Sequence, residues 1–143
     1  MTSNHAFTDS CPKIEAQLVP VLRRMQIFPE YFGRHMLTAE AMVYQTLGSL
    51  CQDYAGGYWD FYELSNGGFY MAPSTDKRMR LQCSGNGFAA EMSADAAGIV
   101  ACLFAFNGLV WRTRDVRFER LFYGLREFAS DHAEACAISA AID

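Results

Sequence analysis

The sequence predicts an α+β fold: a single domain in which a four-stranded antiparallel β-meander, about residues 58–92, packs against N-terminal and C-terminal α-helices. Two observations indicate this class. Short segments of strand-like alternation flank Asn66-Gly67 and Gly85-Asn86-Gly87, which are hairpin turn signals. Apolar residues recur at helical spacing before and after these segments. Because antiparallel sheets can leave one face partly exposed, a meander with one core-facing side fits the pattern.

Length and composition agree with one domain. The chain has 143 residues, of which 51% are hydrophobic and 14% aromatic, and this supplies enough apolar surface for one core. The first ten residues lack the basic start and apolar run of a secretory signal. Residues 1–12 are expected to be loosely ordered.

The cysteines and the apolar segments indicate a cytoplasmic protein. The five cysteines form no Cys-x-x-Cys pair and most have apolar neighbours, which favours reduced thiols. The most apolar run, residues 96–106, is shorter than the ~20 residues that a membrane-spanning helix needs. No membrane contact is therefore expected.

The N-terminal part contains one clear helical pattern. Residues 11–35 are interrupted by three prolines, so we expect an irregular entry segment with one short helix or strand. Thr38 can cap a helix over residues 39–54, which Gly56-Gly57 ends.

The C-terminal part contains two further helical patterns. Ser93 can cap a helix that is apolar almost all round until Asn107-Gly108 ends or distorts it. A long amphipathic pattern follows from about residue 116. A break near Ser130-Asp131 leaves open whether residues 116–143 form one helix or two.

Side-chain parity predicts which residues share a face of each hairpin. A type I′ turn at Asn66-Gly67 has a two-residue loop, and this fixes the pairing of the flanking strands. The core-facing set is then Tyr62, Leu64, Phe69 and Met71, and the opposite set is Trp59, Phe61, Glu63, Tyr70 and Ala72. In the second hairpin the core-facing set is Met79, Leu81, Cys83, Phe88, Ala90 and Met92, opposite Arg80, Gln82, Ala89 and Glu91.

The mixed face of the first hairpin is the candidate partner-binding surface. Aromatic residues among charges are typical of recognition patches, and Trp59, Glu63 and Tyr70 share this face, with Asn66 at the tip. The alternative is that a helix covers the face, which is the more common outcome because aromatic side chains bury well.

No motif predicts catalytic, metal-binding or cofactor-binding residues. The sequence from Gly85 to Ala90 fits a loose dinucleotide-binding pattern, but no helix begins there, so a hairpin turn explains it better. The histidines are isolated from other metal ligands. Cys51, Cys83 and Cys102 fall on predicted core faces, where a thiolate is disfavoured.

Four long strings of residues carry a family resemblance. They are RRMQIFPEYFG (23–33), YAGGYWDFYELSNGGFYMAP (54–73), NGFAAEMSADAAGI (86–99) and LREFASDHAEACAISAAID (125–143). Together they closely resemble the KlcA/ArdB family of plasmid-borne antirestriction proteins. The resemblance implies a small α+β protein that protects incoming plasmid or mobile-element DNA from host type I restriction-modification systems.

The charge pattern constrains how such protection works. A protein that imitates DNA must be densely acidic, because the duplex presents one negative charge per ~1.7 Å of axis. This chain has 16 acidic and 12 basic residues, and arginines interrupt the acidic residues of its C-terminal third. The pattern favours recognition of the type I restriction-modification complex, or of a host factor that controls it.

Two other classes of function are weighed against protein recognition. Nucleic-acid binding is not expected, because the C-terminal arginines are irregularly spaced and Glu119 and Glu127 partly offset them. The alternative to a binding protein is a small enzyme that acts on a nucleotide, a protein or DNA. A pocket with convergent ionisable groups would distinguish the enzyme.

Overall fold

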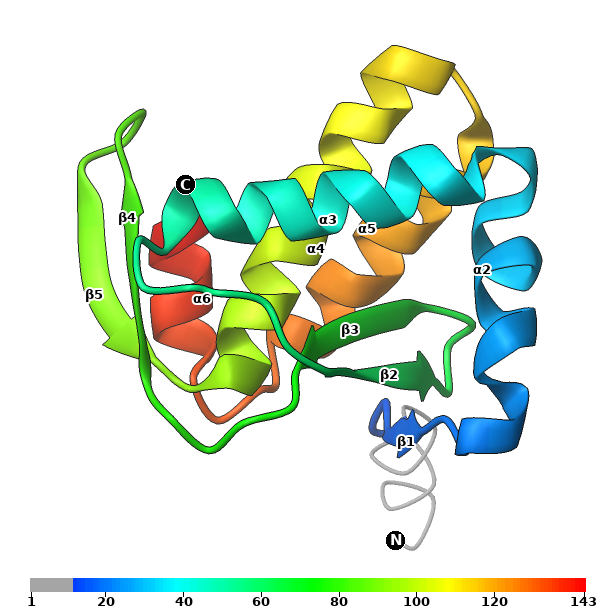
Figure 1. The fold of residues 1–143 in the computed structure, drawn as a ribbon, viewed down its shortest axis with the longest axis horizontal. Coiled ribbons are helices and arrows are strands. Elements are labelled where there is room, and N and C mark those ends of the chain that lie inside the picture. The colour runs from blue at the N-terminus through cyan, green and yellow to red at the C-terminus, as the bar shows by residue number, and fades with distance from the viewer. Residues whose placement is uncertain (1–11) are drawn as a thin grey trace, which may run out of the picture.

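Five strands and a set of helices make up residues 12–143, the part of the chain that the computed structural model describes (Figure 1). Residues 1–11, and with them most of the segment predicted to be loosely ordered, lie outside the described residues. The strands are β1 (Ala16–Leu18), β2 (Trp59–Leu64), β3 (Phe69–Pro73), β4 (Met79–Cys83) and β5 (Phe88–Met92). The helices are α2 (Arg24–Phe32), α3 (Met36–Leu50), α4 (Ala94–Thr113), α5 (Val116–Ala129) and α6 (Ala135–Ile142), with short 3-10 helices η1 (Val21–Arg23) and η2 (Gly33–His35).

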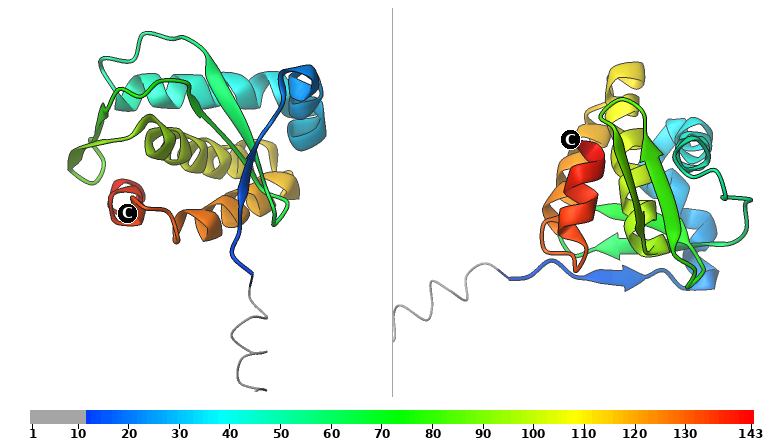
Figure 2. Two further views of the ribbon diagram at one scale, coloured as in Figure 1. Left: turned by 90° about the horizontal axis from the view of Figure 1, so that it is seen from below. Right: turned by 90° about the vertical axis from the view of Figure 1, so that its left-hand side faces the viewer.

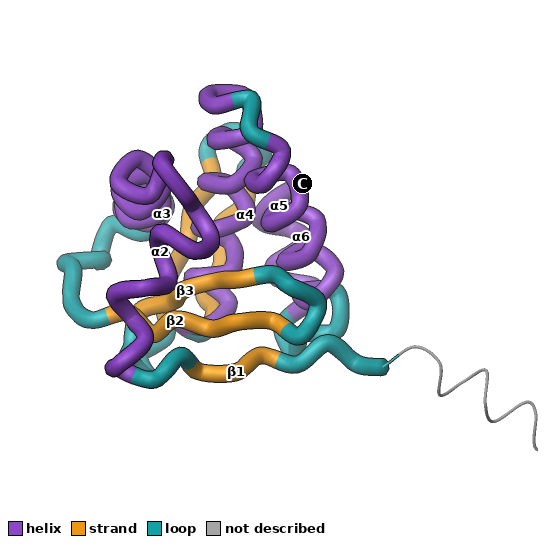
Figure 3. Tube along the Cα trace, turned by 90° about the vertical axis from the view of Figure 1, so that its right-hand side faces the viewer, coloured by secondary structure: helices purple, strands orange, loops and turns teal. Residues whose placement is uncertain are grey.

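The strands form two antiparallel sheets, which confirms the α+β class but not the single meander. Within residues 12–143, one sheet has the order β1-β2-β3, and β4 and β5 form a second sheet of two strands (Figures 2 and 3). Both predicted hairpins are present, so the prediction is wrong only in joining them into one four-stranded sheet. β1 is an additional strand, in which Ala16 pairs with Leu64 and Leu18 with Tyr62.

Helix α4 covers the edge of β3 to which a meander would add β4. The Met71 carbonyl accepts a hydrogen bond from the Cys102 thiol of α4 at 3.6 Å. Burial raises the pKa of Cys102 to about 12, so the thiol keeps the proton that it donates. A Cβ on Gly98 would lie 2.5 Å from the Met71 carbonyl oxygen, so the close approach of the helix requires glycine. An edge covered in this way accepts no further strand.

The first hairpin turns through three residues rather than two. Gly67 N–H donates to the Leu64 carbonyl, and Leu64 N–H donates to the Gly68 carbonyl, both at 2.9 Å. In this turn Gly67 has a positive φ of 87° and Asn66 does not, whereas a type I′ turn needs both. The odd loop length shifts the register by one residue, so the predicted faces of this hairpin are wrong. Phe61, Glu63, Phe69 and Met71 share one face, and Asp60, Tyr62, Tyr70 and Ala72 share the other.

We expect Gly67→Ala to lower the free energy of unfolding by about 1–2 kcal/mol, because an L-residue is strained in the left-handed region. Gly85→Ala in the second hairpin is the matched control, since Gly85 has no positive φ and an added Cβ meets nothing within 4 Å. Urea unfolding of both variants measures the difference. Equal free energies for the two variants would contradict the three-residue turn.

Helices cover both faces of the β2–β3 hairpin. On one face, Phe61 lies against Phe28 of α2, with ring centroids 5.1 Å apart. On the other face, Tyr70 stacks on Phe128 of α5 at 5.6 Å. Every residue of β3 is consequently buried. The alternative interpretation, in which a helix covers the mixed face, is the one that the structure confirms.

The second hairpin has the predicted register. Met79 pairs with Met92 and Leu81 with Ala90, and residues alternate between buried and exposed along β4. Its four-residue loop, residues 84–87, keeps the parity that the sequence predicts.

The N-terminal helices begin and end at other residues than predicted. The proline-rich entry segment contains α2, with Pro29 inside the helix. Helix α3 begins at Met36 rather than after Thr38, because the chain enters it from the η2 turn at Gly33, where φ is 57°. The side chain of its N-cap residue, His35, makes no capping hydrogen bond, and the helix ends at Leu50.

Helix α4 is the centre of the domain and is longer than predicted. Ser93 caps it as predicted, accepting a hydrogen bond from Ala96 N–H at 3.1 Å. The helix continues through Asn107-Gly108, because Gly108 is packed against Met42 of α3 rather than left in a turn. By length and composition α4 could cross a membrane, but 67% of its most apolar window is buried inside the domain.

The C-terminal pattern forms two helices. Asp115 caps the start of α5. After α5 the chain turns through residues 130–134 before α6 begins. The structure thus decides between the two arrangements that the sequence left open.

Candidate functional site

The four predicted partner-binding residues do not form one exposed patch. Trp59 and Tyr70 are buried, with 4% and 2% of their surface exposed. The Glu63 side chain is 24% exposed, and Asn66 is exposed at the turn. Tyr70 and Glu63 lie on opposite faces of the hairpin because of the three-residue turn. Whether any of these residues contacts a partner stays a prediction.

Trp59 joins the first sheet to the segment around α3. Its indole N–H donates to the Tyr54 hydroxyl at 2.8 Å. The Tyr44 ring of α3 lies edge-on to the indole, with centroids 5.1 Å apart. The Trp59 carbonyl accepts a hydrogen bond from the Arg24 side chain. The indole therefore packs inside the domain, as most buried tryptophans do when their N–H finds an acceptor.

Glu63 is held by side chains from η1 and α2. The Arg23 guanidinium contacts both carboxylate oxygens of Glu63, and it also lies 3.2 Å from Glu30. The Tyr31 hydroxyl donates to the same carboxylate at 2.7 Å. The hydrogen bond from Arg23, together with the Tyr31 hydrogen bond, lowers the pKa of Glu63 below its usual value.

We expect Glu63→Gln to destabilise the protein most at neutral pH. The folded-state pKa of Glu63 is below its ordinary value of 4.5, so its stabilisation is complete above that value and is lost as the pH falls through the lower folded-state pKa. The difference in free energy of unfolding between wild type and variant should therefore narrow in acid. Urea titrations between neutral and acidic pH measure this difference. Tyr31→Phe should also lower the free energy of unfolding, but by less than Glu63→Gln. Parallel profiles for wild type and Glu63→Gln would contradict this role.

Asn66 docks the hairpin turn onto α5. Its side-chain amide donates to the Gly124 carbonyl at 3.0 Å, and its oxygen accepts from Gly68 N–H at 3.0 Å. A Cβ on Gly124 would lie 3.6 Å from Gly68 Cα, which shows how closely the turn approaches the helix. Asn66 also lines an open groove with Tyr123 and Glu127.

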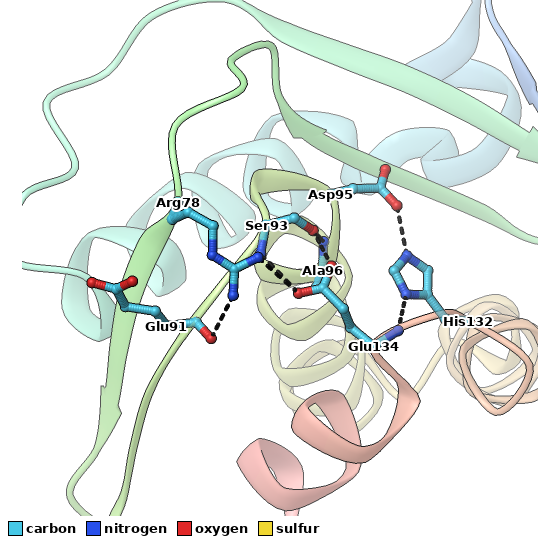
Figure 4. A network of polar contacts seen from close by, with 7 residues as sticks. All are labelled: Arg78, Glu91, Ser93, Asp95, Ala96, His132 and Glu134. Atoms are coloured by element: carbon cyan, nitrogen blue, oxygen red, sulfur yellow. Dashed lines mark hydrogen bonds and ion pairs between the residues drawn. The ribbon is translucent and has the colours of Figure 1, made fainter.

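Tyr70 contacts a polar network that sequence reasoning missed. Figure 4 shows the part of this network that contains Ser93, Asp95, His132 and Glu134. The Tyr70 hydroxyl donates to Asp95 Oδ1 at 2.8 Å, and His132 Nε2 lies 2.8 Å from Asp95 Oδ2. His132 Nδ1 accepts a hydrogen bond from Glu134 N–H at 2.9 Å. The neutral tautomer with its proton on Nε2 satisfies both contacts of the ring. Burial and the Asp95 carboxylate raise the pKa of Tyr70, so the hydroxyl remains a donor.

The Glu134 carboxylate continues the network to the start of α4. It accepts hydrogen bonds from the Ser93 hydroxyl and from Ser93 N–H, the latter at 3.0 Å, and it lies 3.7 Å from Arg78. Burial acts to raise the pKa of Glu134, but the two hydrogen bonds from Ser93, together with the nearby Arg78 and His132, outweigh it, and the pKa lies below its usual value. We call Tyr70, Ser93, Asp95, His132 and Glu134 the polar latch, since they join β3, α4 and the α5–α6 turn.

The polar latch contains the residue types of a catalytic triad but not its hydrogen bonds. In a triad the serine hydroxyl donates to histidine, whereas here the Ser93 hydroxyl donates to Glu134 and accepts from Ala96 N–H. Both ring nitrogens of His132 already have partners. The arrangement caps α4 and fixes the α5–α6 turn. Asp95, His132 and Glu134 all fall within the strings that resemble the KlcA/ArdB family, which was the only signal for them in the sequence.

A shallow groove of about 500 Å³ lies between the end of α3, α4 and the β4–β5 turn. Small polar and apolar residues line most of it, with Asp143 as its ionisable carboxylate. Cys83, at its wall, has a pKa raised by burial. The groove therefore offers surface for contact rather than a set of convergent acids and bases.

The fold and the polar latch define a class of small α+β domain in which helices cover both faces of a small antiparallel sheet. The chain belongs to the antirestriction protein family, whose model matches residues 52–143. This membership confirms the family that the sequence strings suggest.

Similar proteins agree over nearly the full length. Two proteins of Escherichia coli, both named antirestriction protein KlcA, are 51% and 46% identical and cover 91% of this chain, which spans 94% and 95% of their lengths. The protein YafX of Escherichia coli K12 is 40% identical over 92% of this chain and 91% of its own length. A solved structure of this family matches with a TM-score of 0.86 and 44% identity over 94% of this chain and 99% of the other. The KlcA and ArdB proteins of that work show a novel fold and antirestriction activity against type I DNA restriction systems in vivo but not in vitro.

Proposed function

We propose that this protein protects incoming plasmid or mobile-element DNA from type I restriction-modification systems, acting in the cytoplasm by recognition of a protein. The observation that carries the proposal is the match to KlcA and ArdB, which have this activity and share the fold over almost the whole chain. The same fold with 44% identity makes a shared surface function the simplest expectation.

The charge distribution supports protein recognition over DNA mimicry. Carboxylates of the domain are paired with cations at several places, as in Glu63 with Arg23, Asp115 with Arg117 and Glu134 with Arg78. Such pairs neutralise the negative charge that a mimic of DNA would have to display. The net charge of −4 is too small to resemble a polyanion.

The behaviour of KlcA and ArdB supports a target that purified enzymes lack. Those proteins act in vivo but not in vitro, so a component of the cell is required for their effect. For this chain we favour a host factor that controls the restriction complex over direct inhibition of the complex.

The test compares two measurements, which are protection of unmodified plasmid in cells and activity of the purified endonuclease in the presence of the purified chain. Expression of this chain in a strain with an active type I system should restore transformation by unmodified plasmid, while the purified chain should leave the purified endonuclease active. No restoration in cells would refute the proposed function. Inhibition of the purified endonuclease would refute the indirect route.

An enzyme is the second candidate, favoured by the grouping of Ser93, Asp95 and His132 in the polar latch. Ser93→Gly keeps a residue that suits an N-cap, so the lost cap costs only about 0.3 kcal/mol. The variant also loses the hydrogen bond from the Ser93 hydroxyl to Glu134, which costs about 1 kcal/mol more. We expect this variant to fold and to protect cells as the wild type does. A folded Ser93→Gly variant without protection would favour the enzyme.

Two of the four candidate partner-binding residues reach the surface. We propose that Glu63 and Asn66 are available to a partner, and that Trp59 and Tyr70 act by holding the hairpin in place. Glu63→Gln and Asn66→Ala separate these roles when protection is measured against the fraction of folded protein.

A further inference from the structure

The corner between α4 and α5 exposes arginine and apolar side chains together. Trp111 has 65% of its surface exposed, and Arg112, Arg114 and Val116 beside it are exposed as well. Figure 1 shows this corner beside the turn from α2 into α3, where Arg34 and Leu37 are exposed. We call these six residues the basic corner.

Two contacts hold the halves of the basic corner together. His35 Nε2 lies 3.6 Å from Asp115 Oδ2, which joins the start of α3 to the cap of α5. The Arg117 guanidinium packs on Gly33, where an added Cβ would lie 2.3 Å from a guanidinium nitrogen. The corner is therefore a fixed surface rather than two independent loops.

The arginines of the basic corner are not neutralised within residues 12–143. Arg23, Arg78 and Arg117 have carboxylate partners within 4.0 Å, whereas Arg34, Arg112 and Arg114 have none in this part of the chain. The domain thus presents a local positive charge although its net charge is −4. Such a region attracts acidic groups and repels other cations.

Arg114 has a backbone conformation that favours glycine. It ends α4 with φ of 60°, and it is the only non-glycine residue with positive φ among residues 12–143. Glycine is the usual residue at this position of a helix end, because an L-residue there is strained. The guanidinium lies over the Trp111 ring at 5.5 Å, so the strained residue carries a side chain that is displayed at the surface.

We propose that the basic corner binds a carboxylate-rich segment of a partner protein. Tryptophan and arginine are enriched among the residues that contribute most to protein interfaces, and the basic corner adds the exposed apolar side chains of Leu37 and Val116. A DNA partner fits less well, because Asp115 and Glu119 lie among the arginines and few free cations are available for phosphates. The further assignment of the basic corner as the recognition surface of the antirestriction activity rests on the proposed function.

Fluorescence titration with a peptide of glutamate and leucine residues tests the binding. The chain has two tryptophans and Trp59 is buried, so changes in emission on binding report on Trp111. We expect saturable binding that weakens with added salt and is at least tenfold weaker in Arg112→Glu/Arg114→Glu. Lys77→Glu/Arg80→Glu makes the same change in net charge near β4 and should alter affinity by less than twofold.

Arg114→Gly separates binding from folding. It should raise the urea midpoint of unfolding, because glycine relieves the positive φ, and it should weaken peptide binding severalfold. A variant that fails to fold would not give this combination, so the two measurements together exclude a merely structural effect.

Three results would overturn the proposal. They are no saturable binding of the peptide by the wild type, equal losses in the two double variants, and tighter binding of a short DNA duplex than of the peptide. Protection in cells is measured separately: if the wild type does not protect, the proposed function fails and the titration alone decides the basic corner. Arg112→Glu/Arg114→Glu should lose protection while the β4 control keeps it.

Discussion

Gly98→Ala is expected to lower the free energy of unfolding by about 3 kcal/mol, the upper end of the usual cost of overpacking a core. The added Cβ would lie 2.4 Å from Ala72 Cβ and 2.5 Å from the Met71 carbonyl oxygen, so α4 would have to move away from β3. That movement would also break the hydrogen bond from Cys102 to Met71. Urea unfolding measures the loss, and we expect protection in cells to fall with the folded fraction.

Gly48→Ala in α3 is the matched control. Gly48 is also inside a helix, but a Cβ there meets nothing within 4 Å and the position is exposed. Helix propensity alone stabilises Gly→Ala by about 0.5–1 kcal/mol, so Gly48→Ala should raise the free energy of unfolding. If both variants shift stability in the same direction, the close approach of α4 to the edge of β3 is wrong.

His132→Ala is expected to lower the free energy of unfolding by about 2–3 kcal/mol, because it leaves half-buried hydrogen-bonding groups without a partner. The variant loses the contact with Asp95 at 2.8 Å and the hydrogen bond from Glu134 N–H at 2.9 Å. His35→Ala is the control, since His35 is also half-buried but makes a longer contact, 3.6 Å, to Asp115. In thermal and urea unfolding, His132→Ala should be much less stable than His35→Ala.

A double-mutant cycle tests whether the polar latch acts as one unit. Tyr70→Phe and His132→Ala both remove a partner of Asp95, so their effects should not add. Additive losses would mean that the two contacts are independent. Full stability of His132→Ala with loss of protection would instead give His132 a direct part in function.

The helix over β3 gives a reason for the family resemblance to extend along the whole chain. The strings that resemble the KlcA/ArdB family include Met71, Gly98, Asp95 and His132, which meet at the covered edge and in the polar latch. These contacts join residues from three of the four strings, and the proposed partner residues Glu63 and Asn66 also lie within one of them. The basic corner lies outside all four strings.

The sequence by itself determined the features that depend on neighbouring residues. The turn residues placed both hairpins, Ser93 placed the start of α4, and the apolar run from Ala96 placed the central helix. The register of the second hairpin was also predictable, because its loop has an even number of residues. In each case the information lies within a few positions along the chain, where turn chemistry, capping and periodicity act.

Only the tertiary structure decided the features that depend on distant residues. The Asn66 turn docks on α5 and has three residues instead of two, which placed Tyr70 on the opposite face from Glu63. Helix α4 occupies the edge of β3, so the two hairpins stay apart, and Asp95 meets a histidine 37 positions away. Local patterns cannot encode these contacts, because each one is chosen by packing free energy that exists only once the elements have come together.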